Sequence, residues 1–313
     1  MIATRQHAQM RKIALILLAV LLVLLALSLL TGCGSRAQDS VESEAGEPDP
    51  DQLVLQKASD EDVAQLTLVP GTIRRRGFVV DDTLTGSDLG DIHFSIHVPS
   101  SYDGSEPYAL YIHCPGRGGL YYQGVGANLD EDFVFVANAY VPDMIVVSPQ
   151  LDDNGPLSAA KTILLTRWLL GAYDIDCGRV YLSGYSDGGE TLSYVLGERA
   201  DLYSRALMVA AQWDGAMDSV VENRVPLRIS IGESDECYTS QPANDAYKDL
   251  FLKYKATGLT SSQIGNLLVL DVKPTGYFDD QLEDDPFGFW RQHNGAGVLF
   301  PHDPDVMGWL LRP

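Results

Sequence analysis

Short apolar runs that favour β-strands alternate with helical patterns through most of this chain. Residues 145–147 and 267–270 are continuously apolar, as expected of strands that are covered on both faces of a sheet. Eight segments qualify as strands, namely residues 77–81, 92–98, 109–114, 144–148, 180–183, 205–210, 227–231 and 267–272.

Helical spacing of apolar residues separates several of these strands. It is clearest over residues 159–170 and 243–254, and Asp303-Pro304 provides a cap and first turn for a short final helix ending at residue 311. The alternation predicts an α/β fold with a mostly parallel eight-stranded sheet, antiparallel at its first strands and covered by helices on both faces. Sites in such sheets form beyond the carboxyl ends of the strands.

One strand-to-helix junction carries a motif with a chemical meaning. Residues 179–189 read Arg-Val-Tyr-Leu-Ser-Gly-Tyr-Ser-Asp-Gly-Gly, in which an apolar strand gives way to a helix at G-x-S-x-G. Such a turn exposes the hydroxyl of Ser186 and places the amide of Asp187 at a helix N-terminus, where it can stabilise an oxyanion. Ser186 is therefore the predicted nucleophile.

A serine nucleophile needs a base, and the base needs a carboxylate to orient it. His293 and His302 are the histidines that follow Ser186 in the chain. Asp235 is the predicted acid because it follows the strand at 227–231, with Glu233 as its rival.

A glycine-rich loop at residues 114–119 follows an earlier strand and is expected to supply the second oxyanion donor, from the amide of Gly116 or Arg117. His113, at the end of that strand, is expected to shape the loop rather than to act as the base.

These residues make the chain resemble the α/β-hydrolase superfamily, and within it the secreted esterase-type and prolyl-oligopeptidase-like members, including polyhydroxybutyrate depolymerases and feruloyl esterases. The resemblance covers about residues 75–312 and rests on residues 173–189, 232–236 and 303–310. It implies an α/β-hydrolase fold and favours His293 over His302, because the base of these relatives lies well before the Trp-Leu pair of the final helix. His293 is 16 residues before Trp309, and the glycines after it predict a flexible loop.

The predicted activity is hydrolysis of carboxylic esters through an acyl-enzyme on Ser186, with His293 and Asp235, and without a metal or organic cofactor. Two alternatives are a serine peptidase of prolyl-oligopeptidase type and an idle lipid-anchored binding protein on the same fold. A peptidase could hold a substrate amine with the acidic run at residues 279–285. Aromatic side chains proposed to line a substrate pocket are Tyr121, Tyr122, Trp213, Phe287, Phe289 and Trp290.

The N-terminus predicts export and lipidation. Three basic residues precede an uncharged apolar run at 13–30, and Leu-Thr-Gly-Cys at 30–33 resembles the lipobox of bacterial lipoproteins. We therefore expect a signal peptide at residues 1–32, a lipidated Cys33, an acidic linker through residue 67 and a catalytic domain at 68–313. The expected location is extracytoplasmic, anchored to a bacterial membrane; an uncleaved transmembrane anchor is the alternative.

Charge and cysteine content limit the partners. The net charge of −21 becomes −24 when residues 1–32 and their three basic residues are removed, so nucleic acid is not an expected partner. Cys114, Cys177 and Cys237 would remain beside Cys33, and the sequence leaves open which of them, if any, pair in a disulfide.

Overall fold

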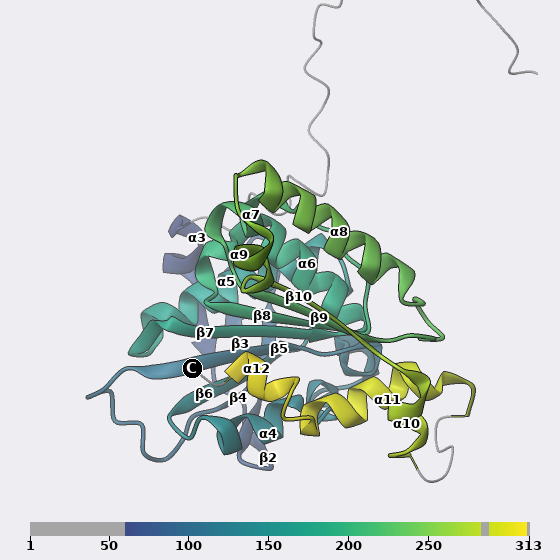
Figure 1. The fold of residues 1–313 in the computed structure, drawn as a ribbon. Helices are drawn as coiled ribbons and strands as arrows, with labels where there is room; N and C mark the ends of the chain where they lie inside the picture. The colour runs from purple at the N-terminus through teal and green to yellow at the C-terminus, as the bar shows by residue number, and fades with distance from the viewer. Residues whose placement is uncertain (1–59, 283–287, 312–313) are drawn as a thin grey trace, which may run out of the picture. The chain divides into compact units, whose positions relative to one another are not determined.

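The computed structural model describes residues 60–282 and 288–311, which form an α/β fold with helices on both faces of a central sheet (Figure 1). The sheet has ten strands in the order β1-β3-β4-β6-β5-β7-β8-β9-β10, with β2 also paired to β3. Pairing is antiparallel from β1 to β6 and parallel from β6 to β10. The strands are β1 Thr67–Val69, β2 Ile73–Arg75, β3 Phe78–Thr85, β4 Ile92–His97, β5 Tyr108–Cys114, β6 Met144–Pro149, β7 Ile175–Tyr185, β8 Arg205–Val209, β9 Leu227–Gly232 and β10 Leu268–Lys273.

The predicted α/β class is confirmed, but the predicted strand number of eight is wrong. The two missing strands, β1 and β2, have three residues each and lie at the antiparallel end of the sheet. Nearly all of their residues are exposed, so neither strand has the apolar run that marks the central ones. In contrast, every residue of β6 is buried.

Helices α5 Pro156–Ala172, α6 Asp187–Arg199, α7 Asp218–Asn223, α8 Gln241–Ala256 and α9 Ser261–Gly265 lie above the sheet in Figure 1. Helices α4 Phe133–Tyr140, α10 Thr275–Asp279, α11 Arg291–Leu299 and α12 Met307–Leu311 lie below it. Short 3-10 helices are η1 Arg117–Gly119, η2 Tyr121–Gln123, η3 Ala127–Leu129, η4 Ala200–Leu202, η5 Gly288–Trp290 and η6 Phe300–His302.

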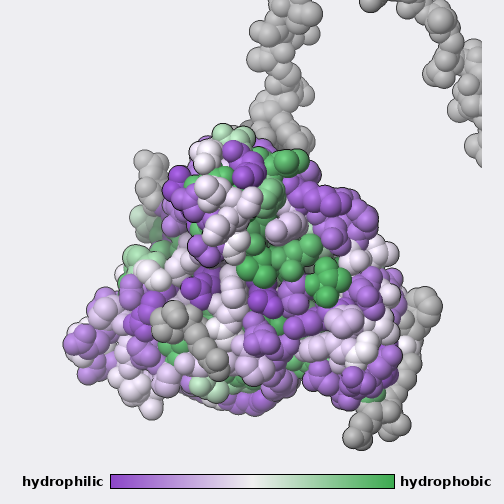
Figure 2. Space-filling view, viewed as in Figure 1, coloured by the Kyte–Doolittle hydropathy of each residue, from purple (hydrophilic) through white to green (hydrophobic). Residues whose placement is uncertain are grey.

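The central strands alternate between two hydrophobic clusters, one on each face of the sheet. In β5, Leu110 and Ile112 belong to the cluster beneath α5, α6 and α8, whereas Tyr111 packs into the cluster formed with α4, α11 and α12. This is the period of two that a strand covered on both faces requires. Figure 2 shows that hydrophilic residues cover most of the outer face in the same view, apart from a hydrophobic patch near its centre.

Two elements near the ends of the described part differ from the sequence analysis. Helix α3 Asp60–Gln65 lies within the range expected to be linker, and Leu66 after it is buried. The final helix is Met307–Leu311 and does not extend back to Asp303; ahead of it, Asp303 Oδ1 accepts the amide of Asp305 at 2.8 Å in a local turn.

Two features from the sequence analysis concern export. The apolar run at 13–30 and Cys33 lie outside the described residues; within the described part, no helix is long and apolar enough to cross a membrane. Cys114, Cys177 and Cys237 are all free thiols, with Cys114 buried and the other two exposed.

Candidate active site

Ser186 lies in a sharp turn between the last residue of β7 and the first residue of α6. Its φ of 53° and ψ of −125° are unusual for a residue with a side chain. Two glycines allow the turn: a Cβ on Gly184 would lie 2.2 Å from the carbonyl oxygen of Gly188, and a Cβ on Gly188 would lie 2.1 Å from that of Cys114. The strained turn therefore also brings the start of α6 against the end of β5.

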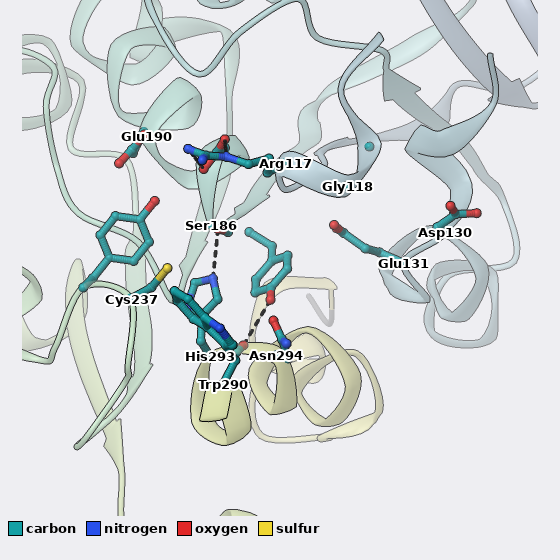
Figure 3. Close-up of a pocket in the computed structure, with 14 residues that line it drawn as sticks. Arg117, Gly118, Asp130, Glu131, Ser186, Glu190, Cys237, Trp290, His293 and Asn294 are labelled. Carbon is teal, nitrogen blue, oxygen red and sulfur yellow. Dashed lines mark hydrogen bonds and ion pairs between the residues drawn. The ribbon is translucent and has the colours of Figure 1, made fainter. Parts of the chain in front are cut away.

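Ser186, His293 and Asp235 form one continuous line of hydrogen bonds. Ser186 Oγ is 3.0 Å from His293 Nε2, and His293 Nδ1 is 2.9 Å from Asp235 Oδ2 and 3.2 Å from its Oδ1. All three residues are buried, and Figure 3 shows the imidazole of His293 pointing at the serine. Three residues far apart in the sequence thus meet at the carboxyl ends of β7 and β9.

The Asp235 carboxylate is fixed by the loop that carries it. Its Oδ1 accepts the amides of Cys237 and Tyr238, each at 2.9 Å. These bonds leave Oδ2 directed at His293 Nδ1, so the imidazole carries a hydrogen on Nδ1 and presents Nε2 as an acceptor to Ser186.

His293 lies in helix α11 and not in the flexible loop expected from the sequence. Its amide donates to Glu236 at 2.9 Å, and Tyr185 donates its hydroxyl to the carbonyl of His293 at 3.1 Å. Gly297 serves packing and not flexibility, because a Cβ there would lie 2.9 Å from Tyr185 Cζ. His293, the predicted base, is thus held by the β7 residue directly before Ser186.

The rival residues lie elsewhere. The His302 side chain is 56% exposed and lies 3.1 Å from Asp132 Oδ2. Glu233 is exposed and accepts the amide of Thr275 at 2.6 Å. Neither contacts Ser186 or His293 by any hydrogen bond that the described structure contains.

The two predicted oxyanion segments meet beside Ser186. Asp187 is the first residue of α6, so its amide is not used in the hydrogen bonds of the helix. The carboxylate of Asp187 accepts a hydrogen bond from Arg117 Nε at 2.9 Å. That hydrogen bond raises the pKa of the Arg117 guanidinium. The Gly116 amide already donates to Glu131 Oε1 at 2.9 Å, so the structure favours Arg117, which was predicted as the alternative, over Gly116 as the second donor.

A cavity of about 710 Å³ opens over Ser186 (Figure 3). Of the aromatic side chains proposed for it, Trp290 lines it, whereas Tyr121 stacks on His93 and Trp213 donates to the carbonyl of Gly215. Phe287 and the side chain of Phe289 lie outside the described residues. The lining residues are Arg117, Gly118, Gly119, Asp130, Glu131, Tyr185, Ser186, Asp187, Glu190, Cys237, Tyr238, Trp290, His293 and Asn294.

Several polar lining groups were not found from the sequence. Glu190, one turn after Ser186, is 5% exposed; burial raises its pKa despite hydrogen bonds from Asn154 and Tyr238. Burial, together with the charges of Glu190 and Asp187, raises the pKa of Tyr238. Glu190 sits on the polar side of an amphipathic helix in the sequence, so no pattern marked it as buried.

The fold is that of the α/β-hydrolases, and Ser186, His293 and Asp235 meet at the carboxyl ends of its strands. A thermostable esterase shares it with a TM-score of 0.54 at 18% identity, covering 80% of this chain and 63% of its own. A glucuronoyl esterase from Solibacter usitatus gives a TM-score of 0.50 at 8% identity, covering 82% of this chain and 91% of its own.

These likenesses establish the fold and no more, because the identities are low. The chain spans less than two thirds of the length of the thermostable esterase. No model of a known protein family matches the sequence, and neither does any curated protein.

Proposed function

We propose that this protein is a serine hydrolase that cleaves carboxylic esters through an acyl-enzyme. The observation that carries the proposal is the line from Ser186 Oγ through the imidazole of His293 to Asp235, with contacts of 3.0 and 2.9 Å. A neutral hydroxyl is a weak nucleophile, and this arrangement is the one that activates it.

In the first half-reaction, Ser186 Oγ bonds to the ester carbonyl carbon while its proton moves to His293 Nε2. Asp235 stabilises the imidazolium that forms. The amide of Asp187 and an amide of the loop beginning at Arg117 hold the oxyanion, and collapse of the tetrahedral intermediate expels the alcohol, which takes the proton from Nε2.

In the second half-reaction, water enters the position left by the alcohol. His293 removes a proton from this water, which attacks the acyl carbon, and the Ser186 oxygen leaves with the proton returned from Nε2. The products are a carboxylic acid and the free enzyme, and the atoms and charges balance without a cofactor.

The charges around the cavity favour an uncharged ester. Arg117 is the permanently cationic side chain among the described residues that line the cavity, and Asp187 neutralises it at 2.9 Å. Three further carboxylates, on Asp130, Glu131 and Glu190, also line it. A substrate with a free carboxylate would lose its hydration without gaining an unpaired cation there.

The peptidase alternative would use the acidic run to hold a substrate amine, and one carboxylate of that run is already paired. Asp279 pairs with Arg291 at 2.8 Å, and residues 283–285 lie outside the described part of the chain. We therefore retain ester hydrolysis as the proposed reaction.

The test is hydrolysis of p-nitrophenyl acetate and butyrate by the full chain in detergent. Ser186→Ala is expected to abolish turnover with the circular dichroism spectrum unchanged; retained turnover in this variant would overturn the proposal. A fluorophosphonate probe distinguishes the hydrolase from the idle binding protein. An activated Ser186 should be labelled by the probe, whereas a folded wild-type chain without labelling would support the idle protein.

We also propose that the enzyme acts outside the cytoplasm, anchored by acyl chains on Cys33 after removal of residues 1–32. The support is the basic, apolar and Leu-Thr-Gly-Cys order of residues 5–33. Mass spectrometry of the protein purified from bacterial membranes tests it: the wild type should begin at a diacylglyceryl cysteine, and Cys33→Ser should not.

A further inference from the structure

A buried chain of side chains lies behind the loop that faces Ser186. Tyr111 Oη is 2.6 Å from Ser183 Oγ, which is 2.8 Å from His113 Nδ1. His113 Nε2 is in turn 2.8 Å from Glu131 Oε2, and the other oxygen of Glu131 accepts the Gly116 amide at 2.9 Å. This row of hydrogen bonds connects the buried strands β5 and β7 to the glycine-rich loop.

The directions of these hydrogen bonds follow from the carboxylate at the end. An ionised carboxylate only accepts, so His113 Nε2 carries the hydrogen that it donates to Glu131. In a neutral imidazole Nδ1 then accepts from the Ser183 hydroxyl, and Ser183 accepts from Tyr111. In this arrangement each of these hydrogen-bonded side chains has a partner.

The composition is that of a serine, histidine and carboxylate set, but its position excludes direct catalysis. Ser183 is 0% exposed and His113 is 1% exposed, so no substrate reaches either. The ring of His113 is also held by stacking on Phe133, with ring centroids 4.6 Å apart and planes at 24°.

Glu131 is the member of the chain that reaches the cavity. Its side chain is 16% exposed, and Figure 3 shows its carboxylate directed toward the cavity from the side opposite Cys237. Gly116 is packed between this carboxylate and Tyr185: a Cβ on Gly116 would lie 3.2 Å from Glu131 Oε1 and 3.0 Å from Tyr185 Cδ1.

The bond to Glu131 fixes the orientation of the peptides that follow Gly116. Gly116 is the N-cap of η1, and its carbonyl accepts the amide of Gly119 at 2.8 Å. The amides of Arg117 and Gly118 are therefore the unpaired first donors of this turn, and the described residues contain no hydrogen-bond acceptor for either. Both residues line the cavity beside Ser186.

We propose that Glu131, braced by His113, is a positioning residue that holds the loop from Gly116 so that its free amides meet the oxyanion. The inference rests on the proposed hydrolase function, because it assigns to the loop a role in that reaction. Preorganised donors contribute to rate only when they are held at the place where charge develops.

Glu131→Gln is the direct test, since it keeps the shape of the side chain and removes one of its two acceptors. The loop amides should then be less well placed, and kcat for p-nitrophenyl butyrate should fall about 10- to 100-fold with KM nearly unchanged. The inhibition constant of a trifluoromethyl ketone, whose adduct with Ser186 carries an oxyanion, should rise by the same factor as kcat/KM falls. A purely structural role for Glu131 would not produce this parallel.

The matched control is Asp132→Asn, which removes the carboxylate of the neighbouring residue. Asp132 pairs with Arg76 and His302 and does not contact the loop. This variant should leave both constants as in the wild type. Glu131→Asp repeats the test if the glutamine variant does not fold, because the shorter carboxylate cannot hold both His113 and Gly116; an intermediate loss is expected.

Two results separate failure of this inference from failure of the proposed function. If the wild type hydrolyses the ester and Ser186→Ala does not, but Glu131→Gln keeps kcat and ketone affinity within about two-fold, only the positioning role is refuted. A loss confined to KM also refutes it. If Ser186→Ala retains turnover, the hydrolase proposal itself fails.

Discussion

Replacement of Asp235 by asparagine tests how the imidazole of His293 is held. Asp235 Oδ1 accepts the amides of Cys237 and Tyr238, whereas Oδ2 is 2.9 Å from His293 Nδ1. An asparagine must keep its carbonyl oxygen on the two amides, because an NH2 group there would face two other donors. Its NH2 group would then face Nδ1 and force the imidazole hydrogen onto Nε2, where it could not accept the proton of Ser186.

The expected magnitude follows from this wrong tautomer. In other enzymes with a serine, histidine and aspartate set, the same exchange lowers kcat about 10⁴-fold, which corresponds to about 5.4 kcal/mol of activation free energy. KM should change little, because Asp235 is not among the residues that line the cavity. The free energy of unfolding should change by no more than about 1 kcal/mol, since both amide bonds are kept.

The assay is p-nitrophenyl butyrate hydrolysis by the full chain, with Glu233→Gln as the matched control on the same loop. Glu233 is the rival carboxylate of the sequence analysis, and it contacts Thr275 instead of the histidine. Asp235→Asn with more than about a tenth of the wild-type kcat would refute the tautomer argument. A large loss in Glu233→Gln alone would assign the orienting role to the other residue.

Three further predictions concern the turn, the cavity and the second histidine. Gly188→Ala should destabilise the fold by about 3 kcal/mol or more in urea unfolding, because its Cβ would lie 2.1 Å from the carbonyl oxygen of Cys114. Gly171→Ala, at an open position of α5, should instead raise the free energy of unfolding by about 0.5–1 kcal/mol. Equal effects of the two substitutions would contradict the packing argument. Glu190→Gln should raise the melting temperature at pH 7–8, and this gain should shrink toward pH 4. The reason is that a carboxyl whose pKa is raised by burial contributes stability below its unfolded pKa and loses that stability as pH rises through its folded pKa. A gain in melting temperature that does not depend on pH would disprove the burial argument. His302→Ala should cost less than about 1 kcal/mol and leave ester hydrolysis unchanged, since it removes one exposed ion pair; lost activity would restore it as the base.

Much of the fold was predictable because the central strands are buried on both faces. Such strands are marked by apolar runs, and β6 and the buried second half of β7 are both of this kind. Strands β1 and β2 carry no such mark, since they are short and exposed. The final helix was placed too early because Asp303 forms a turn with the same local chemistry as a helix cap.

The candidate site was predictable where a local motif imposes geometry and not where packing decides. The glycines around Ser186 are required by close backbone contacts within a few residues of one another. Glu131, by contrast, stands between two aspartates and has the sequence character of a solvated acidic run. Only the fold brings it against His113 and Gly116.

The amino-acid sequence alone is enough to predict the α/β class, the strained serine turn and the order in which serine, carboxylate and histidine follow one another. These depend on short-range patterns: apolar periodicity along an element and glycine where two backbones touch. Only packing between distant segments places His293 at Ser186, because helix α11 is held against Tyr185, and leaves His302 in η6 exposed beside Asp132. The same packing sets which carboxylates are buried beside the serine, since burial arises from residues distant in the chain that no local pattern records.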